Sequence, residues 1–332
     1  MDSKRIVKMQ KLLVAVTLLI STITYQAKAL QQFVDELPKL PTVYGYWNPK
    51  AKSGSDRLTM GMFPTKWKFH RDLRPTNVFA YGVSKDKASV PGPIIEARPG
   101  KPTHVTWANY LGDTHLFSST PKGRAIPTVV HLHGGVQDPQ IDGHPLAWFT
   151  QKFNDTGPAF KTRTYTYNNE PPAGPGNLIY HDFAIGLARV NVLAGLFGAY
   201  VVRDPDQETR IFNFLPEFER HLVIFDRSFS GNGESMTVDP TGDRDVIIVN
   251  GKAWPFLNVQ PRRYRFRITN VSNKRYFRFH LQLPNQNQAP PFIQLGSDSS
   301  YLPSPVRTSQ ILLAPFETAD VIIDFANLRN NT

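Results

Sequence analysis

Two histidines, His131 and His133, lie two residues apart in the apolar run "VVHLHGG" at residues 129–135. If this run is a strand, side chains two residues apart point to the same face, with Cα atoms roughly 7 Å apart. Imidazole is a usual protein ligand for copper and zinc, so this face could bind a metal. The pattern alone is weak, because most such histidine pairs have only a structural role.

A third histidine strengthens the metal hypothesis. His181 lies in "YHDFA", residues 180–184, after a loop rich in proline and glycine. No metal-like spacing is found among the other histidines, which are His70, His104, His115, His144, His221 and His280. We expect His104 and His280 to be strand residues with local hydrogen bonds. A cation such as Fe²⁺ is conceivable at two acidic groups, but solvated loop or strand faces explain them more simply: Glu217 with Glu219, and Glu317 with Asp320 and Asp324.

The composition indicates an all-β protein. The chain has 332 residues, 40% of them hydrophobic and 20% charged, with 28 prolines and 22 glycines distributed without a period. Short alternating segments separated by turn signals predict strands. The segments are 103–107, 128–133 and 162–167 in one half, and 245–249, 264–269, 276–283 and 319–325 in the other. We therefore predict tandem Greek-key β-sandwiches.

The domain boundaries follow from the leader and from a polar segment. Residues 1–29 have a basic start, an apolar run over 12–20 and an Ala-Lys-Ala cleavage pattern, which predicts a signal peptide. The apolar run is shorter than the roughly 20 residues of a membrane span, and no later segment comes close. The polar segment 203–209 is predicted to link domain one, residues 30–205, to domain two, residues 206–332.

A secretory route agrees with three tripeptides that permit N-glycosylation, at Asn154, Asn270 and Asn330. The compartment is predicted to be the endoplasmic reticulum or the extracellular space and cell wall. Cysteine is absent from the 332 residues, so stability must come from burial without disulfides.

The formal net charge is +11, and its densest patch covers residues 262–267. There Arg263, Arg265 and Arg267 alternate with apolar residues, which predicts a strand with one solvated basic face and one apolar face. Nucleic-acid binding is not predicted for a secreted chain with so moderate a patch. Fingerprints for phosphate loops, dinucleotides or a nucleophile elbow are absent as well.

Several motifs together resemble the multicopper oxidases. "HLHGG" and "YHDFAIGLARVNVLAGLFGAYVVRD" resemble the first cupredoxin domain of that family, and "VPGPIIEARPG" (90–100) and "VNGKAWP" (249–255) match it in the same order. The resemblance is strongest to the bilirubin oxidase and spore-coat laccase branch. Within it, segments 45–49 and 65–73 are most like plant oxidases of the low-phosphate-root type. The likeness extends from about residue 37 to 325.

The resemblance implies copper as cofactor and assigns roles to the histidines. His131 would bind a type 2 copper, and His133 and His181 would each bind one of two type 3 coppers where dioxygen is reduced. The family has a further histidine two residues after His181, and this chain has Phe183 there. A phenyl ring offers no lone pair, so one ligand is missing.

Two functions follow from the resemblance. One is a copper-dependent oxidoreductase that couples oxidation of ferrous iron or a phenol to dioxygen reduction, in root responses to phosphate or iron. The family places its thiolate copper in a third cupredoxin domain, which we expect to be absent here because no cysteine is present. The alternative is therefore an inactive, secreted two-domain glycoprotein with at most a weak metal site. We also expect self-association through an apolar surface of domain two.

Overall fold

The computed structural model describes residues 30–117, 123–170, 176–212, 215–230, 232–238, 246–283 and 289–326. The elements discussed below lie within one compact unit, Phe33–Thr332. Among the described residues, strands far outnumber helices and the two α-helices have seven residues each, so the all-β prediction is confirmed. Within these ranges, no helix is long and apolar enough to cross a membrane. The predicted signal peptide lies outside the described residues.

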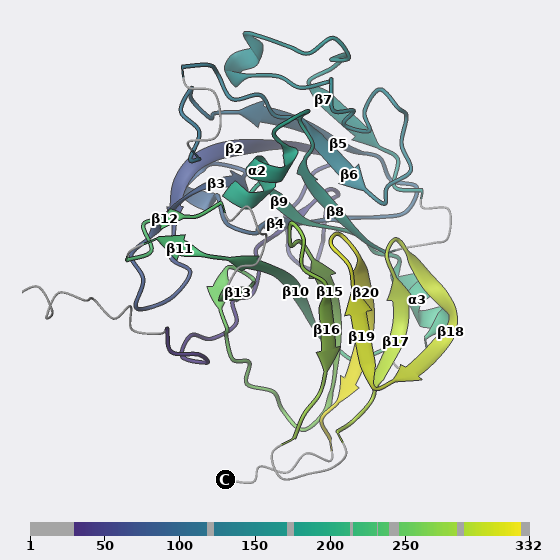
Figure 1. The fold of residues 1–332 in the computed structure, drawn as a ribbon. Helices are drawn as coiled ribbons and strands as arrows, with labels where there is room; N and C mark the ends of the chain where they lie inside the picture. Colours follow the sequence, from purple (N-terminus) through teal and green to yellow (C-terminus); the bar gives the residue numbers. More distant parts are fainter. Residues whose placement is uncertain are drawn as a thin grey trace, which may run out of the picture. The chain divides into compact units, whose positions relative to one another are not determined.

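Strands β1 to β9 form the first sandwich, drawn in purple to teal in Figure 1. Its five-stranded sheet has the order β1 (Thr42–Tyr44), β4 (Gly92–Ala97), β9 (Phe197–Val202), β8 (Asn177–Asp182) and β6 (Val130–His133). Its four-stranded sheet has the order β3 (Thr76–Gly82), β2 (Arg57–Trp67), β5 (Thr103–Asn109) and β7 (Thr164–Tyr167). Three short helices connect these strands: η1 (Lys85–Lys87), η2 (Gln151–Phe153) and α2 (Ala188–Ala194).

Alternation along β5 shows why these sheets pack face to face. Its residues alternate between buried and half-buried, as the period-two pattern predicts, and its Trp107 points into the core. There Trp107 meets Tyr81 of β3 and Tyr180 of β8, with ring centroids 5.6 Å away in both cases. The neighbour of Tyr180 along β8 is His181, so this aromatic core fixes the strand that carries a candidate ligand.

Strand β10 and strands β13 to β20 form the second sandwich, drawn in green to yellow in Figure 1. Its seven-stranded sheet has the order β14 (Lys252–Ala253), β13 (Val246–Val249), β10 (Phe218–Arg227), β15 (Arg263–Asn270), β20 (Thr318–Asp324), β17 (Phe292–Ser297) and β18 (Ser300–Thr308). The pair β16 (Phe277–His280) and β19 (Gln310–Leu313) packs its apolar side chains against this sheet. A further short pair is formed by β11 (Phe229–Ser230) and β12 (Ser235–Met236).

The segment between the two sandwiches contains a short helix. The last strand of the first sandwich ends at Val202 and the next strand begins at Phe218. Between them lies helix α3 (Pro205–Ile211), which begins where the Asp204 carboxylate accepts hydrogen bonds from two backbone N–H groups. Proline at the first helical position suits this start, because its missing N–H would have no partner there. The polar residues therefore form a capped helix.

The arginines of β15 also differ from their prediction. Arg263 is exposed, but Arg265 and Arg267 are each only 1% exposed, so the expected solvated basic face is wrong for both. The prediction of a solvated face is equally wrong for Glu219 and Asp320, which form ion pairs with these two arginines. The reason is that one face of β15 covers the apolar core, while the other is covered by α3 and by neighbouring strands that carry carboxylates.

Six residues form what we call the charge cluster: Arg203, Glu208, Glu219, Arg265, Arg267 and Asp320. They come from both sandwiches and from α3. Arg267 donates to Glu219 at 2.9 Å and to Glu208 at 3.2 Å, and Arg265 donates to Asp320 at 2.9 Å. Burial alone would raise the pKa of Glu219, but Arg267 and Arg203 hold it well below its usual range.

Candidate metal centre

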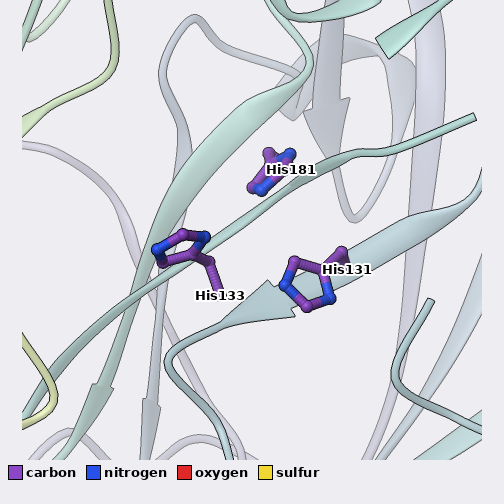
Figure 2. A group of neighbouring side chains, drawn as sticks. All are labelled: His131, His133 and His181. Atoms are coloured by element: carbon purple, nitrogen blue, oxygen red, sulfur yellow. The ribbon is translucent and has the colours of Figure 1, made fainter. Parts of the chain in front are cut away.

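The three candidate ligands come together on two adjacent strands. Strands β6 and β8 pair antiparallel with His131 directly opposite His181, and His133 follows on the same face of β6. Figure 2 shows the three imidazole rings around a shared space. One potential ligand atom from each ring lies within 4.8 Å of the others. We call His131, His133 and His181 the histidine cluster. Within the described ranges, it is the one group of histidines and carboxylates that lie close enough together to bind a metal ion.

His181 has a lone pair that no group in the described part of the chain satisfies. Its Nδ1–H donates to the backbone carbonyl of Asp182 at 2.8 Å, which leaves the lone pair on Nε2. Nε2 is buried and has no hydrogen-bond partner among the residues that the structure describes. Burial lowers the pKa of His181 to about 3, so the ring stays neutral at physiological pH. A buried acceptor without a partner is costly, and a neutral imidazole is the form that binds metals.

His131 is oriented by the turn that follows β6. Its Nδ1 lies 2.5 Å from the backbone oxygen of Asp142, and the Asp142 carboxylate is 3.4 Å away. Gln137 donates to that carboxylate at 2.6 Å. A proton on Nδ1 that is donated to this carbonyl leaves the lone pair on Nε2. This arrangement is usual for metal-binding histidines. Gly143 makes this approach possible, since a Cβ there would lie 2.1 Å from a backbone oxygen.

His133 forms the solvent-facing side of the cluster. Its side chain is the most exposed of the three. The part that is withdrawn from water and the neighbouring His131 lower the pKa of His133, whereas Asp298 raises it. Asp298 lies in the turn between β17 and β18, so the second sandwich reaches this site. The exposed ring leaves a side from which an ion can enter.

A buried carboxylate holds β8 beside the strand that carries the other two histidines. Asp182 accepts hydrogen bonds from the backbone of Val129 at 3.1 Å and of Ala184 at 3.2 Å, and from the Asn191 amide at 2.8 Å. Burial raises the pKa of Asp182 to about 7 in spite of these bonds. This network fixes the chain directly after His181.

Two phenyl rings contact the cluster. Phe183 is 38% exposed and its ring centroid lies 5.2 Å from that of His131. Phe316, in the turn between β19 and β20, lies 4.5 Å from His181 and 5.7 Å from His133. Sequence reasoning missed Phe316, because no local pattern links it to His181 and His133, which lie 135 and 183 residues earlier. It also missed Asp142, although the turn signal at 142–143 marked a close return of the chain.

The other predicted sites have separate outcomes. His104 shares a 2.9 Å hydrogen bond with Thr166 across two strands, the local role expected for it. Asn154 is exposed, as a glycan requires. Asn270 is fully buried and its amide donates to two backbone oxygens, so the folded chain does not present it to a glycan. Asn330 lies outside the described residues.

Sequence comparison identifies relatives that match this chain over nearly its full length. Multicopper oxidase LPR1 of Arabidopsis thaliana is 46% identical over 97% of this chain and 59% of its own length. A laccase of Bacillus subtilis is 37% identical over 89% of the chain and 59% of its own length. The chain belongs to the multicopper oxidase family. It spans about three fifths of the length of these relatives.

Solved structures agree on the fold. The McoA multicopper oxidase of Aquifex aeolicus superposes with a TM-score of 0.72 at 22% identity, over 91% of this chain and 59% of that one. A laccase from Pediococcus acidilactici gives a TM-score of 0.70 at 25% identity, with the same coverage. No protein-family model matches the chain.

Family membership implies copper, and the residues fit this metal. Three neutral imidazoles are donors that copper accepts, and two of them have Nδ1 occupied by a carbonyl so that Nε2 is free. The buried lone pair of His181 is the observation that most directly indicates a ligand. Phe183 does not fit, because it cannot donate where the resemblance predicts a fourth imidazole.

Proposed function

We propose that this multicopper oxidase chain binds copper through His131, His133 and His181 and acts in a copper-dependent oxidoreductase. The convergence of three imidazoles, one with a buried and unpartnered Nε2, carries this proposal. When bound, copper supplies one-electron chemistry toward dioxygen. The chain's own residues hold the site: Asp142 orients one ring, and Asp182 fixes the strand of another.

His131 would serve a type 2 copper and His133 and His181 a type 3 pair, with dioxygen as one substrate and ferrous iron or a phenol as the other. That cluster needs more ligands than these three histidines. A thiolate copper site would also have to come from elsewhere, because the 332 residues contain no cysteine. A role in phosphate- or iron-related root responses rests on the likeness to the plant relatives.

The inactive alternative predicts that the histidine cluster binds copper weakly at most and that the chain takes part in no oxidase reaction. No structural observation favours this alternative. A site that had lost its metal would be expected to replace some of the three imidazoles by apolar side chains, and all three are present and oriented. The lack of a cysteine still argues that the cluster cannot receive electrons through a thiolate of these residues.

Copper binding by matched histidine variants tests the proposed function. The purified chain is loaded with copper, dialysed and assayed for bound metal. His133→Ala and His181→Ala should lose bound copper, whereas His280→Ala, an exposed strand histidine on β16, should retain it. Equal copper in all variants, or none in the unaltered chain, would contradict the proposal.

Secretory targeting and glycosylation are proposed on the leader and on the exposed position of Asn154. The destination would be the endoplasmic reticulum or the cell wall. Endoglycosidase treatment of the protein from a eukaryotic host should shift its mass, and Asn154→Gln should reduce the shift by one glycan. An unchanged shift in that variant would contradict the assignment to Asn154.

Self-association is proposed on the exposed apolar residues of the second sandwich. Tyr276 and Leu312, on or beside the β16–β19 pair, are 66% and 62% exposed. Apolar patches of this kind favour association. Light scattering at increasing concentration should show a rising mass, and a constant monomer mass would contradict this prediction.

A further inference from the structure

Two connections of the first sandwich line a hollow at its surface. Residues 45–56 connect β1 to β2, and residues 98–102 connect β4 to β5. Because β1 pairs in parallel with β4, and β2 with β5, the two connections run side by side. The hollow has a volume of about 640 Å³, within the range of roughly 300–1,000 Å³ that is usual for ligand sites. In the five-stranded sheet, β1 and the histidine-bearing β6 lie at opposite edges, so the hollow is separate from the histidine cluster.

Trp47 presents a large apolar ring at the surface of this hollow. Its side chain lines the hollow and is 63% exposed. The loop that carries it is closed by backbone hydrogen bonds of 2.8 and 3.3 Å between Asn48 and Ser53, and the Asn48 side-chain oxygen accepts from the Lys50 N–H at 3.0 Å. Gly54 has φ 108°, and a Cβ there would lie 2.1 Å from a backbone oxygen, so the return of the loop requires glycine. Tryptophan held at a surface in this way is typical of binding sites.

The charges of the hollow favour an anionic ligand. Arg98 and Lys101 line it, and Asp56 is the acidic one among its lining residues. Among the residues that the structure describes, neither Arg98 nor Lys101 forms an ion pair. The neighbouring Glu96 is already engaged, because Arg203 lies 3.3 Å from its carboxylate. The hollow therefore offers two cations whose charge no described carboxylate of the chain compensates by direct contact.

Arg98 is held in position by an aromatic ring and by the backbone. Its guanidinium lies over the ring of Tyr46, 4.7 Å from the centroid, and donates to the backbone oxygen of Arg203 at 3.3 Å. The Tyr46 hydroxyl donates in turn to Glu96 at 2.6 Å. A guanidinium that is already positioned loses less conformational freedom on binding than a mobile side chain. This arrangement therefore favours binding of a carboxylate.

Asp56 distinguishes between classes of anion. It accepts a hydrogen bond from the Ser55 hydroxyl at 3.4 Å, and both residues are exposed. A ligand that offers only negative charge, such as a nucleic acid, would be repelled by this carboxylate, and an aromatic acid would leave it without a partner. Hydroxyl groups of a ligand can donate to it. A sugar acid has a carboxylate for the cations, hydroxyls for Asp56, and a ring face of C–H bonds for the indole, whose face carries negative charge density.

We propose that this hollow binds a uronate unit of an acidic polysaccharide. The sugar ring lies on Trp47, and its carboxylate binds Arg98 and Lys101. Its hydroxyl groups donate to Asp56. The inference does not rest on copper binding, because the hollow and the histidine cluster lie at opposite edges of the sheet. The proposed extracellular destination would bring the chain into contact with polymers of this class.

Titration of the metal-free full chain with polygalacturonate oligosaccharides tests the proposal, with heat release as the measurement. Two further probes separate the contributions of charge and sugar. Methyl-esterified polygalacturonate keeps the rings and hydroxyls without the charge, and polyglutamate keeps the carboxylates without the sugar. Saturable binding of polygalacturonate is expected, with at least about tenfold weaker binding of the other two polymers. Added salt should weaken the binding of polygalacturonate.

Matched variants assign the binding to the hollow. Trp47→Ala should lower the affinity about tenfold, as truncation of a central aromatic contact does, whereas Trp47→Phe keeps a ring and should retain most of it. Tyr276→Ala removes a ring that is 66% exposed on the second sandwich and should leave the affinity unchanged. Circular dichroism confirms that each variant is folded.

A second pair of variants tests the charge. Lys101→Gln should lower the affinity about two- to fivefold, the range of an exposed ion pair. Lys85→Gln removes the same charge from an exposed position on η1 and should have no effect.

Three results would overturn the proposal. Polyglutamate bound as tightly as polygalacturonate would mean that the net charge of +11 alone attracts the polymer. Unchanged affinity in Trp47→Ala would place the binding elsewhere. The third result is an unaltered chain that binds no polygalacturonate. All of these measurements use metal-free protein, so their failure leaves the proposed copper function standing.

Discussion

The histidine cluster and the charge cluster are both sets of polar side chains withdrawn from water, but they differ in how their hydrogen-bonding capacity is used. In the charge cluster three arginines face three carboxylates, and none of these groups has a buried side-chain atom without a partner in the described part of the chain. In the histidine cluster, Nε2 of His181 has none. The first arrangement is satisfied within the protein, whereas the second keeps a buried lone pair that could bind a ligand.

This difference separates structural from functional burial of polar groups. Buried charges persist when they are paired and hydrogen-bonded, and removal of one partner is then expensive. A desolvated lone pair without a partner is a cost that a bound metal can offset, because binding replaces the missing hydrogen bond with a ligand bond. Substitutions in the charge cluster should therefore change stability, and those in the histidine cluster should change metal affinity.

The largest expected effect is on stability, from Arg267→Met. This change leaves Glu208 and Glu219 buried with one positive charge fewer, and breaking such a pair costs about 3–5 kcal/mol. Chemical denaturation of the metal-free chain measures the free energy of unfolding. Copper affinity of the folded variant should equal that of the unaltered protein.

Arg263→Met is the matched control on the same strand. Arg263 is half exposed, so its loss should cost less than about 1 kcal/mol. Equal destabilisation by the two methionine variants would show that burial of the charge cluster does not determine its contribution.

Much of the fold and of the metal site could be predicted because their signals are local. Alternation over residues 103–107 is a property of consecutive residues, and the structure has β5 there. The His-x-His spacing of residues 131 and 133 likewise sets both rings on one face of β6 before any tertiary contact is known. His181 joined them through resemblance, and the pairing of β6 with β8 supplies the physical reason.

The charge cluster and Phe316 could not be predicted, since their meaning depends on distant segments. The sequence predicts a solvated face for Arg265 and Arg267. In the folded chain, α3 and β20 bring Glu208 and Asp320 against them. Alternation shows that a strand has two different faces, but it does not show whether the polar face meets water or carboxylates. Likewise, the position of Phe316 over His181 follows from how the second sandwich packs on the first.

The next effect in size is stabilisation of the folded chain by copper. A ligand that binds only the folded state stabilises it by about 2.7 kcal/mol at a free concentration 100 times its dissociation constant. Denaturation with copper at that excess should show this increase in the unaltered chain and in the Arg263→Met variant. His133→Ala should lose it, while its metal-free stability stays within about 0.5 kcal/mol, because His133 is exposed. Copper stabilisation that survives in His133→Ala would mean that the ion binds elsewhere.

Acid should weaken the charge cluster by an amount that depends on its carboxylates. Glu208 and Glu219 have pKa values below the ordinary one, because nearby arginines outweigh burial. Their stabilisation is therefore fully present above the unfolded pKa of about 4.3, and it is lost as pH falls from there toward the folded values. Unfolding free energies measured from pH 6 to pH 3 should fall less steeply in Glu219→Gln than in the unaltered chain. Parallel curves would argue against a contribution from Glu219.

The smallest effect is expected at the rim of the same strand pair. Arg263 and Asp324 form an ion pair of 2.9 Å between β15 and β20, the strands that also carry Arg265 and Asp320, but the side chains are 51% and 35% exposed. Water competes for both charges, so Asp324→Asn should lower the free energy of unfolding by about 0.2–1 kcal/mol, and less in high salt. Asp320→Asn changes the same chemical group four residues away, at a buried position. It should lower the free energy of unfolding by about 3–5 kcal/mol, for the same reason as Arg267→Met. Denaturation of both asparagine variants at low and high salt measures how strongly burial changes the contribution of one carboxylate to the free energy of unfolding. Equal losses in the two variants would show that burial does not set this contribution.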